Sequence, residues 1–280
     1  MLVNSRKILK NALDGKYAVG HFNTSNLEET QAIISGAAEM RSPVIVGTSE
    51  SAIDYAGIDN IVDIVQNMAE KADIPIVLHL DHGKNFEIVK RAFDAGYTSL
   101  MFDGSKLPFE ENIKITKKVV NLARGRDVSV EGELGTMLEN IKDKDNSEEY
   151  LTDPNQAAEF VRVTDIDALA VAIGTAHGLP QVQEKIDFER IKEISEKVKI
   201  PLVLHGSSNS TIGDFRKAIK MGIAKVNIDT ELRQAFTEGV RGELRDEDLY
   251  NIREFLAEGR AEVKERVKKL IKVFGSEHKA

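Results

Sequence analysis

Three apolar segments of the sequence end in histidine, and these endings carry the side chains best suited to metal chemistry. The first covers residues 74–83 and ends Asp81-His82-Gly83, while the others reach His177 and His205. Together they hold four of the six histidines in the chain. Imidazoles from three separate strands, His82, His177 and His205, can make an open Zn²⁺ site with room for a substrate oxygen. Asp81 can bind a cation or move a proton at the same strand end as His82.

Polar residues also follow the other apolar segments. In a barrel of parallel strands all carboxyl ends converge on one face, where such enzymes keep their active sites. The residues expected on that face are Asn23, Ser25, Ser49, Asp81, His82, Asp103, Glu133, His177, His205, Asn227, Asp229 and Thr230. The remaining histidines receive lesser roles. His79 is expected to support the site or pack in the barrel interior, His21 to be structural, and His278 to be exposed.

The elements that must position these residues follow a strand-then-helix rhythm. Short β-branched runs alternate with amphipathic segments, which indicates βαβ units and a parallel sheet. The expected strands are Ala18–Asn23, Pro43–Thr48, Ile76–Asp81, Ser99–Asp103, Ser129–Glu133, Ala168–Ile173, Pro201–His205 and Lys225–Ile228. Eight units without a break in composition favour a single-domain (β/α)8 TIM barrel over residues 1–280.

Two helices lie outside this repeat: an extra N-terminal helix, Asn4–Asp14, and a charged C-terminal helical tail, Ile252–Val273. The alternative fold is a doubly wound open sheet. Such a sheet usually has a glycine-rich phosphate-binding turn after its first strand, whereas the first strand here ends His21-Phe22-Asn23-Thr24-Ser25.

Composition excludes several classes of function. The chain has 280 residues, a net charge of −8 and no cysteine. Acidic balance argues against a nucleic-acid partner, which would require clustered Lys and Arg. No apolar run approaches the roughly 20 residues of a membrane helix, and the N-terminus lacks the apolar core of a signal peptide. We therefore expect a cytoplasmic enzyme whose metal is held by histidines and carboxylates.

A phosphate site is predicted beside the metal. Gly206-Ser207-Ser208 follows the seventh strand, and Asn227-Ile228-Asp229-Thr230 ends the eighth. Thr211 and Asp214 have the spacing of a capping box that opens the intervening helix. Small residues and hydroxyls near a helix N-terminus suit a phosphate group. A metal, a phosphate pocket and a carboxylate together favour making or breaking a carbon–carbon bond next to a carbonyl.

These motifs resemble the class II, metal-dependent fructose-bisphosphate aldolases over nearly the whole chain. The most specific are Leu-His79-Leu-Asp81-His82-Gly83, Val130-Glu-Gly-Glu133-Leu-Gly135, Gly174-Thr-Ala-His177-Gly178, Leu-His205-Gly206 and Lys225-Val-Asn227-Ile-Asp229-Thr230. The resemblance implies that Asp81 transfers the hydroxyl proton. It also implies that His82, His177 and His205 hold the catalytic Zn²⁺.

Further roles come from the same resemblance. It implies a second or alternative divalent site at Asp103 and Glu133, and a substrate pocket lined by Asn23 and Ser49. The residues implied to bind dihydroxyacetone phosphate are Gly178, Gly206, Ser208 and Asn227, Ile228, Asp229 and Thr230. Members of the family also use a monovalent cation, Na⁺ or K⁺, near the phosphate and assemble as homodimers or homotetramers.

The chain departs from the family pattern in two places: after Glu133, and at His205-Gly-Ser-Ser-Asn, which replaces the commoner Gly-Gly form. Many relatives continue the Glu133 motif through a Gly-Gly pair to an acidic residue that removes the carbon-bound proton. Here the sequence is Gly135-Thr-Met-Leu-Glu139, so Glu139 is the expected substitute. The second phosphate of a sugar bisphosphate should meet an arginine near the C-terminus, for which Arg253 and Arg260 are the candidates.

The predicted reaction is reversible cleavage of fructose 1,6-bisphosphate to dihydroxyacetone phosphate and glyceraldehyde 3-phosphate. Tagatose 1,6-bisphosphate, which differs in configuration at one hydroxyl, is the alternative substrate. A Schiff-base aldolase using a barrel lysine such as Lys225 is an alternative mechanism. A barrel that only binds sugar phosphates is the non-enzymatic alternative.

Overall fold

Eight parallel strands form a closed barrel in the order in which they occur in the chain, from β1 to β8. The computed structural model describes residues 2–135, 150–175, 186–206 and 210–280. Each strand pairs with the next, and β8 pairs with β1. The strands are β1 Val19–Asn23, β2 Val44–Thr48, β3 Ile76–Gly83, β4 Ser99–Phe102, β5 Ser129–Leu134, β6 Ala168–Val171, β7 Leu202–Leu204 and β8 Ile223–Ile228. The predicted TIM barrel is confirmed.

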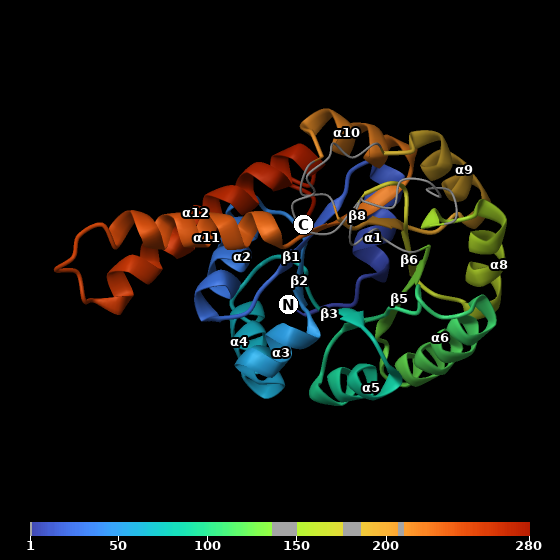
Figure 1. Ribbon diagram of the computed structural model, residues 1–280, viewed down its shortest axis with the longest axis horizontal. Helices are drawn as coiled ribbons and strands as arrows, with labels where there is room; N and C mark the ends of the chain where they lie inside the picture. The colour runs from blue at the N-terminus through green and yellow to red at the C-terminus, as the bar shows by residue number, and fades with distance from the viewer. Residues whose placement is uncertain (1, 136–149, 176–185, 207–209) are drawn as a thin grey trace.

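Helices cover the barrel, and all but the first of them lie around the strands (Figure 1). Within the described ranges these are α1 Arg6–Gly15, α2 Leu27–Glu39, α3 Glu50–Ala56, α4 Ile58–Ala69, α5 Phe86–Ala95, α6 Phe109–Ala123, the 3-10 turn η1 Arg124–Arg126, α8 Pro154–Thr164, α9 Phe188–Val198, α10 Ile212–Met221, α11 Thr230–Glu243 and α12 Ile252–Phe274. Sequence analysis did not predict α3 and α4. Ser49 caps the first of them, and Gly57, with φ 82°, separates the two.

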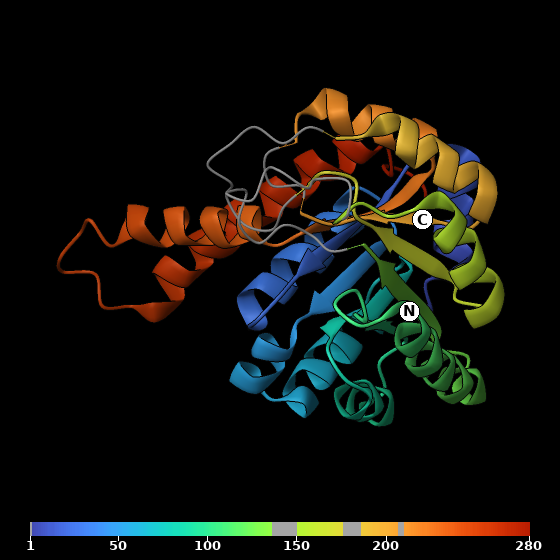
Figure 2. The same cartoon turned by 45° about the vertical axis from the view of Figure 1, so that its right-hand side comes forward.

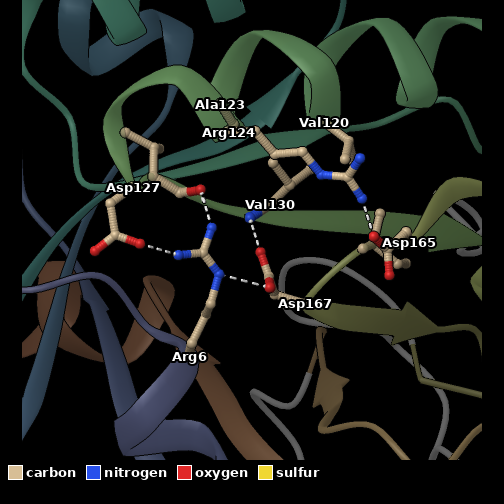
Figure 3. Close-up of a pocket in the computed structure, with 10 residues that line it drawn as sticks. Arg6, Val120, Ala123, Arg124, Asp127, Val130, Asp165 and Asp167 are labelled. Atoms are coloured by element: carbon tan, nitrogen blue, oxygen red, sulfur yellow. Dashed lines mark hydrogen bonds and ion pairs between the residues drawn. The ribbon is translucent and has the colours of Figure 1, made fainter.

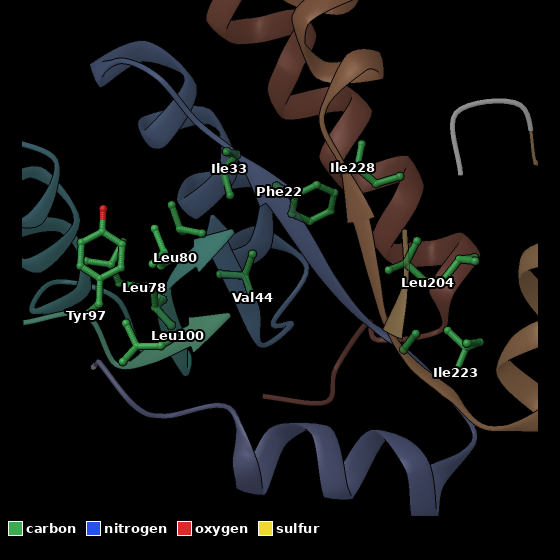
Figure 4. Close-up of a cluster of buried hydrophobic side chains, with 14 of the residues drawn as sticks. Phe22, Ile33, Val44, Leu78, Leu80, Tyr97, Leu100, Leu204, Ile223 and Ile228 are labelled. Atoms are coloured by element: carbon green, nitrogen blue, oxygen red, sulfur yellow. The ribbon is translucent and has the colours of Figure 1, made fainter. Parts of the chain in front are cut away.

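Side chains that point out from the strands form the main apolar core against these helices. Figure 4 shows Phe22 from β1, Leu78 and Leu80 from β3, and Ile228 from β8 in this layer. All four are buried. Full burial of such a side chain stabilises the fold by roughly 1.5–3 kcal/mol relative to exposure. The residues that alternate with these along each strand point into the barrel, because successive side chains of a strand face opposite sides. The barrel interior therefore has its own set of side chains.

The N-terminal helix covers the amino end of the barrel. Ile8, Leu9 and Ala12 of α1 share an apolar cluster with inward-facing strand residues such as Val19 and Val77. The helix is also tied down by charge. Figure 3 shows the Arg6 guanidinium reaching Asp127 and Asp167 on the barrel. These contacts close the end opposite to the one expected to carry chemistry.

The last two helices make a hairpin whose tip projects beyond the barrel in both Figure 1 and Figure 2. A Cβ at Gly239 would lie 2.9 Å from the Gly259 Cα, so glycine at this position lets α11 and α12 cross closely. The predicted tail is helical, as expected. Val263, Val267 and Ile271 on one face of α12 are buried, so it also covers the barrel. Among the described residues, no helix is long and apolar enough to cross a membrane.

Candidate metal and proton-transfer site

A bulge at the end of β3 directs two consecutive side chains to the carboxyl end of the barrel. The pairing of β3 with β4 changes register between Leu80 and Gly83, and His82 has φ 52°. The left-handed conformation is uncommon for a residue other than glycine and often marks a functional position. A Cβ at Gly83 would lie 2.7 Å from the Met101 carbonyl oxygen, so the close approach requires glycine.

The Asp81 carboxylate is buried and held by two amides from neighbouring strands. Asn23 Nδ2 donates to Asp81 Oδ2 at 2.9 Å, and Asn227 Nδ2 donates to Asp81 Oδ1 at 3.1 Å. Burial by itself would raise the pKa of Asp81. The nearby imidazoles and Lys225 hold that pKa well below its ordinary value. Asp81 is therefore an ionised carboxylate with a fixed orientation, which is the protonation state that a general base requires.

His82 and His205 face each other across the barrel mouth. His82 Nε2 lies 2.9 Å from His205 Nδ1. The opposite nitrogen of each ring contacts a carboxylate: His82 Nδ1 lies 3.0 Å from Asp103 Oδ2, and His205 Nε2 lies 3.2 Å from Glu131 Oε1. Metal-binding histidines are typically oriented by carboxylates in this way. The facing nitrogens therefore have the chemistry of a metal site.

The electrostatics of this cluster also favour a cation. Burial opposes charge on His82, yet Asp81, Asp103 and Glu133 raise the pKa of His82 to about 10. Burial, with Asp103 close by, raises the pKa of Glu133 to about 8. Glu133 Oε2 is buried and makes no hydrogen bond within the described part of the chain. These carboxylates would gain from a divalent ion between them.

Two groups of ligand atoms each lie within 4.8 Å of one another: Asp81, His82 and His205 form one, and His82, Asp103 and Glu133 the other. The first group brings His82 and His205, expected as zinc ligands, together with Asp81, and the second brings Asp103 and Glu133, expected at a second divalent site, together with His82. A third group joins His21 and His79 to Asp81. Lys225 Nζ lies 3.2 Å from His79 Nε2, and this ammonium disfavours a second cation there.

Four other predicted site residues lie between the end of a strand and the first turn of the following helix. Ser49 Oγ accepts a hydrogen bond from the Ala52 amide and caps α3. Gly206, two residues beyond the end of β7, has φ 64°. Asp229 pairs with Arg233 at the start of α11, where Thr230 is the first helical residue.

The side chain of Ile228 packs in the outer apolar core, so only its backbone is available at the barrel mouth. The predicted capping box is present, with Thr211 Oγ1 accepting from the Asp214 amide at 3.2 Å.

Five predicted residues lie outside the described ranges: Glu139, His177, Gly178, Ser207 and Ser208. The two candidate arginines are described. Arg253 bonds to Asn251 at the start of α12, and Arg260 donates to Gln31 Oε1 on α2 at 2.7 Å. Neither contact involves a residue of the histidine and carboxylate cluster.

Sequence analysis missed the role of Glu131, although its motif was singled out. Residues two apart in a strand face the same side, so Glu131 enters the barrel with Glu133. Lys225, considered above as a Schiff-base lysine, donates to Glu131 Oε2 at 2.7 Å. The contact pairs this buried lysine with a carboxylate inside the barrel.

Fold and site together define a TIM barrel whose mouth carries a cluster of histidines and carboxylates that could hold a metal ion. Comparison with known proteins agrees. The family model described as fructose-bisphosphate aldolase class-II matches residues 3–279. The fructose-bisphosphate aldolase of Geobacillus stearothermophilus is 43% identical over 283 residues, covering 100% of this chain and 99% of that one. The chain therefore belongs to the class II fructose-bisphosphate aldolase family.

Solved structures extend the similarity. The YdjI aldolase from Escherichia coli K12 has a TM-score of 0.91 and 39% identity, with 100% of both chains covered. A protein described as a putative fructose-1,6-biphosphate aldolase from Coccidioides immitis has a TM-score of 0.89 and 32% identity, covering 98% of this chain and 96% of its own. Both of these structures are described as aldolases.

Proposed function

We propose that this chain catalyses the reversible aldol cleavage of fructose 1,6-bisphosphate to dihydroxyacetone phosphate and glyceraldehyde 3-phosphate. The observation that carries the proposal is the Asp81 carboxylate, fixed by Asn23 and Asn227, beside the facing nitrogens of His82 and His205. A proton acceptor next to a cation site is what cleavage beside a carbonyl requires.

In cleavage, Asp81 takes the proton from the C4 hydroxyl of the open-chain ketose. The C3–C4 bond then breaks, its electron pair moves toward the C2 carbonyl, and the aldehyde leaves. His82 and His205, with His177, would hold Zn²⁺, which supplies a Lewis acid that polarises the substrate carbonyl. Asp103 and Glu133 would hold a second divalent ion. The remaining step returns a proton to C3, and we assign it to Glu139.

The phosphate of the dihydroxyacetone half would lie where two helices begin. The helices α10 and α11 follow β7 and β8, and their N-terminal amides favour an anion. The residues proposed to bind it are Gly178, Gly206, Ser207, Ser208, Asn227, Ile228, Asp229 and Thr230, with Na⁺ or K⁺ nearby. Asn23 and Ser49 would contact the sugar, and Arg253 or Arg260 the second phosphate.

The names of the relatives support this choice of substrate, because the Geobacillus protein, 43% identical, is called a fructose-bisphosphate aldolase. The geometry counts against the Schiff-base alternative, since Lys225 is buried and paired with Glu131. A barrel that only binds sugar phosphates would not require an oriented carboxylate such as Asp81.

We also propose that the enzyme is a cytoplasmic homodimer or homotetramer. Apolar side chains at the tip of the α11–α12 hairpin support the assembly. Tyr250 is 83% exposed and Ile252 is 61% exposed. Contiguous exposed apolar patches commonly mark protein–protein contacts, and these two residues, two positions apart, would contribute to one. Sedimentation measures the assembly directly.

The decisive experiment compares kcat/KM on fructose and tagatose 1,6-bisphosphates in one preparation. Activity should disappear with EDTA and return with added Zn²⁺. A preference for fructose bisphosphate supports the assigned substrate, and the opposite preference replaces it with the tagatose epimer. Activity that survives EDTA and is trapped by borohydride would overturn the metal mechanism.

A further inference from the structure

The middle of the barrel interior holds an ion pair that the proposed reaction does not use. Lys225 is 1% exposed and Glu131 is 2% exposed. Below them the interior is apolar, with Val19, Ile45 and Val203 in one cluster. A buried ion pair is weak evidence for stability, because apolar side chains of similar volume often serve equally well. The pair therefore calls for a role other than packing.

One chain of contacts connects this pair to the metal site. Lys225 Nζ lies 2.7 Å from Glu131 Oε2 and 3.2 Å from His79 Nε2. Glu131 Oε1 lies 3.2 Å from His205 Nε2. His79 Nδ1 lies 2.8 Å from Ser99 Oγ. Each carboxylate oxygen of Glu131 thus has a different partner, one a lysine and the other a histidine.

The donors and acceptors in this chain follow from the charge on Lys225. An ammonium only donates, so His79 Nε2 accepts, and its proton lies on Nδ1 facing Ser99. A carboxylate only accepts, so His205 donates from Nε2 to Glu131. The remaining nitrogen of a neutral His205, Nδ1, then presents its lone pair toward His82. Glu131 sets which nitrogen faces the metal site.

We propose that Glu131, anchored by Lys225, is the positioning residue that fixes the tautomer and orientation of His205, so that Nδ1 is presented to Zn²⁺. The inference rests on the proposed function, because it concerns the same metal site. When the ring nitrogen that does not bind the metal donates to a carboxylate, the orientation of the imidazole is fixed and its metal-binding nitrogen becomes more basic. Lys225 keeps Glu131 charged and prevents it from turning away.

The sharpest test is Glu131→Gln. Lys225 would donate its hydrogen bond to the amide oxygen of the glutamine, so the NH₂ group would face His205 Nε2. His205 would then have to accept at Nε2 and carry its proton on Nδ1, the nitrogen needed by the metal. We expect the Zn²⁺ affinity, measured by chelator competition, to fall roughly 10- to 100-fold. Removal of Lys225 as well, in Glu131→Gln/Lys225→Met, frees the amide oxygen for His205 and should recover part of the affinity.

Two further variants separate positioning from packing. Glu131→Leu/Lys225→Met removes both charges and should keep a thermal midpoint close to that of the parent, yet still bind Zn²⁺ more weakly. Glu29→Gln removes a different buried carboxylate, one that accepts from the Ser25 amide, and should leave Zn²⁺ affinity unchanged. The proposal is overturned if Glu131→Gln binds Zn²⁺ like the parent. It is also overturned if Glu131→Gln/Lys225→Met binds Zn²⁺ no better than Glu131→Gln.

The nitrogen chemical shifts of the His205 ring provide a reading that does not depend on turnover. In the parent they should report a proton on Nε2, and in Glu131→Gln a proton on Nδ1. A parent that shows the Nε2–H tautomer but no aldolase activity would reject the proposed function and retain the role of Glu131. An active parent with the Nδ1–H tautomer would retain the proposed function and reject the role of Glu131.

Discussion

Asp81 and His82 are adjacent in β3, yet both side chains join the same cluster of polar groups at the barrel mouth. Neighbouring residues of a regular strand point to opposite faces. The register shift before Gly83 and the φ of 52° at His82 break that alternation. One local distortion therefore positions both the proposed proton acceptor and a proposed metal ligand.

Gly83→Ala should disturb this distortion. The new Cβ would lie 2.7 Å from the Met101 carbonyl oxygen and 2.9 Å from Leu80 Cδ2, so the bulge must shift. We expect a loss of about 1–3 kcal/mol in the free energy of unfolding, as for other overpacked sites, together with weaker Zn²⁺ binding. Urea denaturation and chelator competition measure the two effects. Gly242→Ala is the control, because nothing lies within 4 Å of its Cβ. Equal stability of the two variants would show that the bulge tolerates a side chain.

Asp81→Asn should separate proton transfer from metal binding. The amide keeps the shape of the side chain but cannot take the hydroxyl proton, so kcat should fall by roughly 10²- to 10⁴-fold. Zn²⁺ content, measured by mass spectrometry, should stay close to that of the parent. Asp94→Asn, which removes an exposed partner of Lys90, should keep parental turnover. Full activity of Asp81→Asn would remove Asp81 from the reaction.

The barrel and the main cluster follow from local sequence patterns. All eight strands were predicted because each is a short β-branched run between amphipathic helices. The residues His82, His205, Asp103 and Glu133 were found because polar side chains at strand ends must converge on one face of a barrel. Helices α3 and α4 were missed: α3 has only 7 residues, and Gly57 alone separates it from the 12-residue α4.

Other features depend on closure of the barrel. Glu131 and Lys225 are 94 positions apart and meet only because β5 and β8 face each other across the interior. A charged residue inside an apolar run does not by itself reveal its partner. The bulge at His82 is likewise a backbone conformation that residue types alone do not specify. The Glu131–Lys225 contact depends on long-range strand pairing, and the bulge depends on the left-handed backbone conformation of His82.

His82→Ala should release the metal. Its Nε2 faces His205, and its Nδ1 contacts Asp103, so the substitution removes a ligand atom and leaves the carboxylates without their partner. We expect most of the bound Zn²⁺ to be lost on dialysis, with activity falling in parallel. His177→Ala is expected to behave in the same way. His278→Ala, in the exposed C-terminal tail, should retain Zn²⁺. Stoichiometric Zn²⁺ in His82→Ala would contradict the assignment.

Arg6→Met should weaken the closure of the amino end without affecting chemistry. Arg6 Nε lies 2.7 Å from Asp167 Oδ1, and Asp167 Oδ2 also accepts from the Val130 amide on β5. Because the guanidinium is partly exposed, its loss should cost only about 1 kcal/mol. For a chain of this size that corresponds to a fall of roughly 2–4 °C in Tm by calorimetry.

Lys10→Met is the matched control for this closure. Lys10 pairs with Asp14 on the exposed face of the same helix, so its replacement should change the Tm much less. Both variants should keep the parental kcat, since α1 packs at the amino end of the barrel, whereas Asp81 and His82 lie at the carboxyl end of β3. A large loss of turnover in Arg6→Met with little change in Tm would mean that the two ends of the barrel are coupled, which the geometry does not predict.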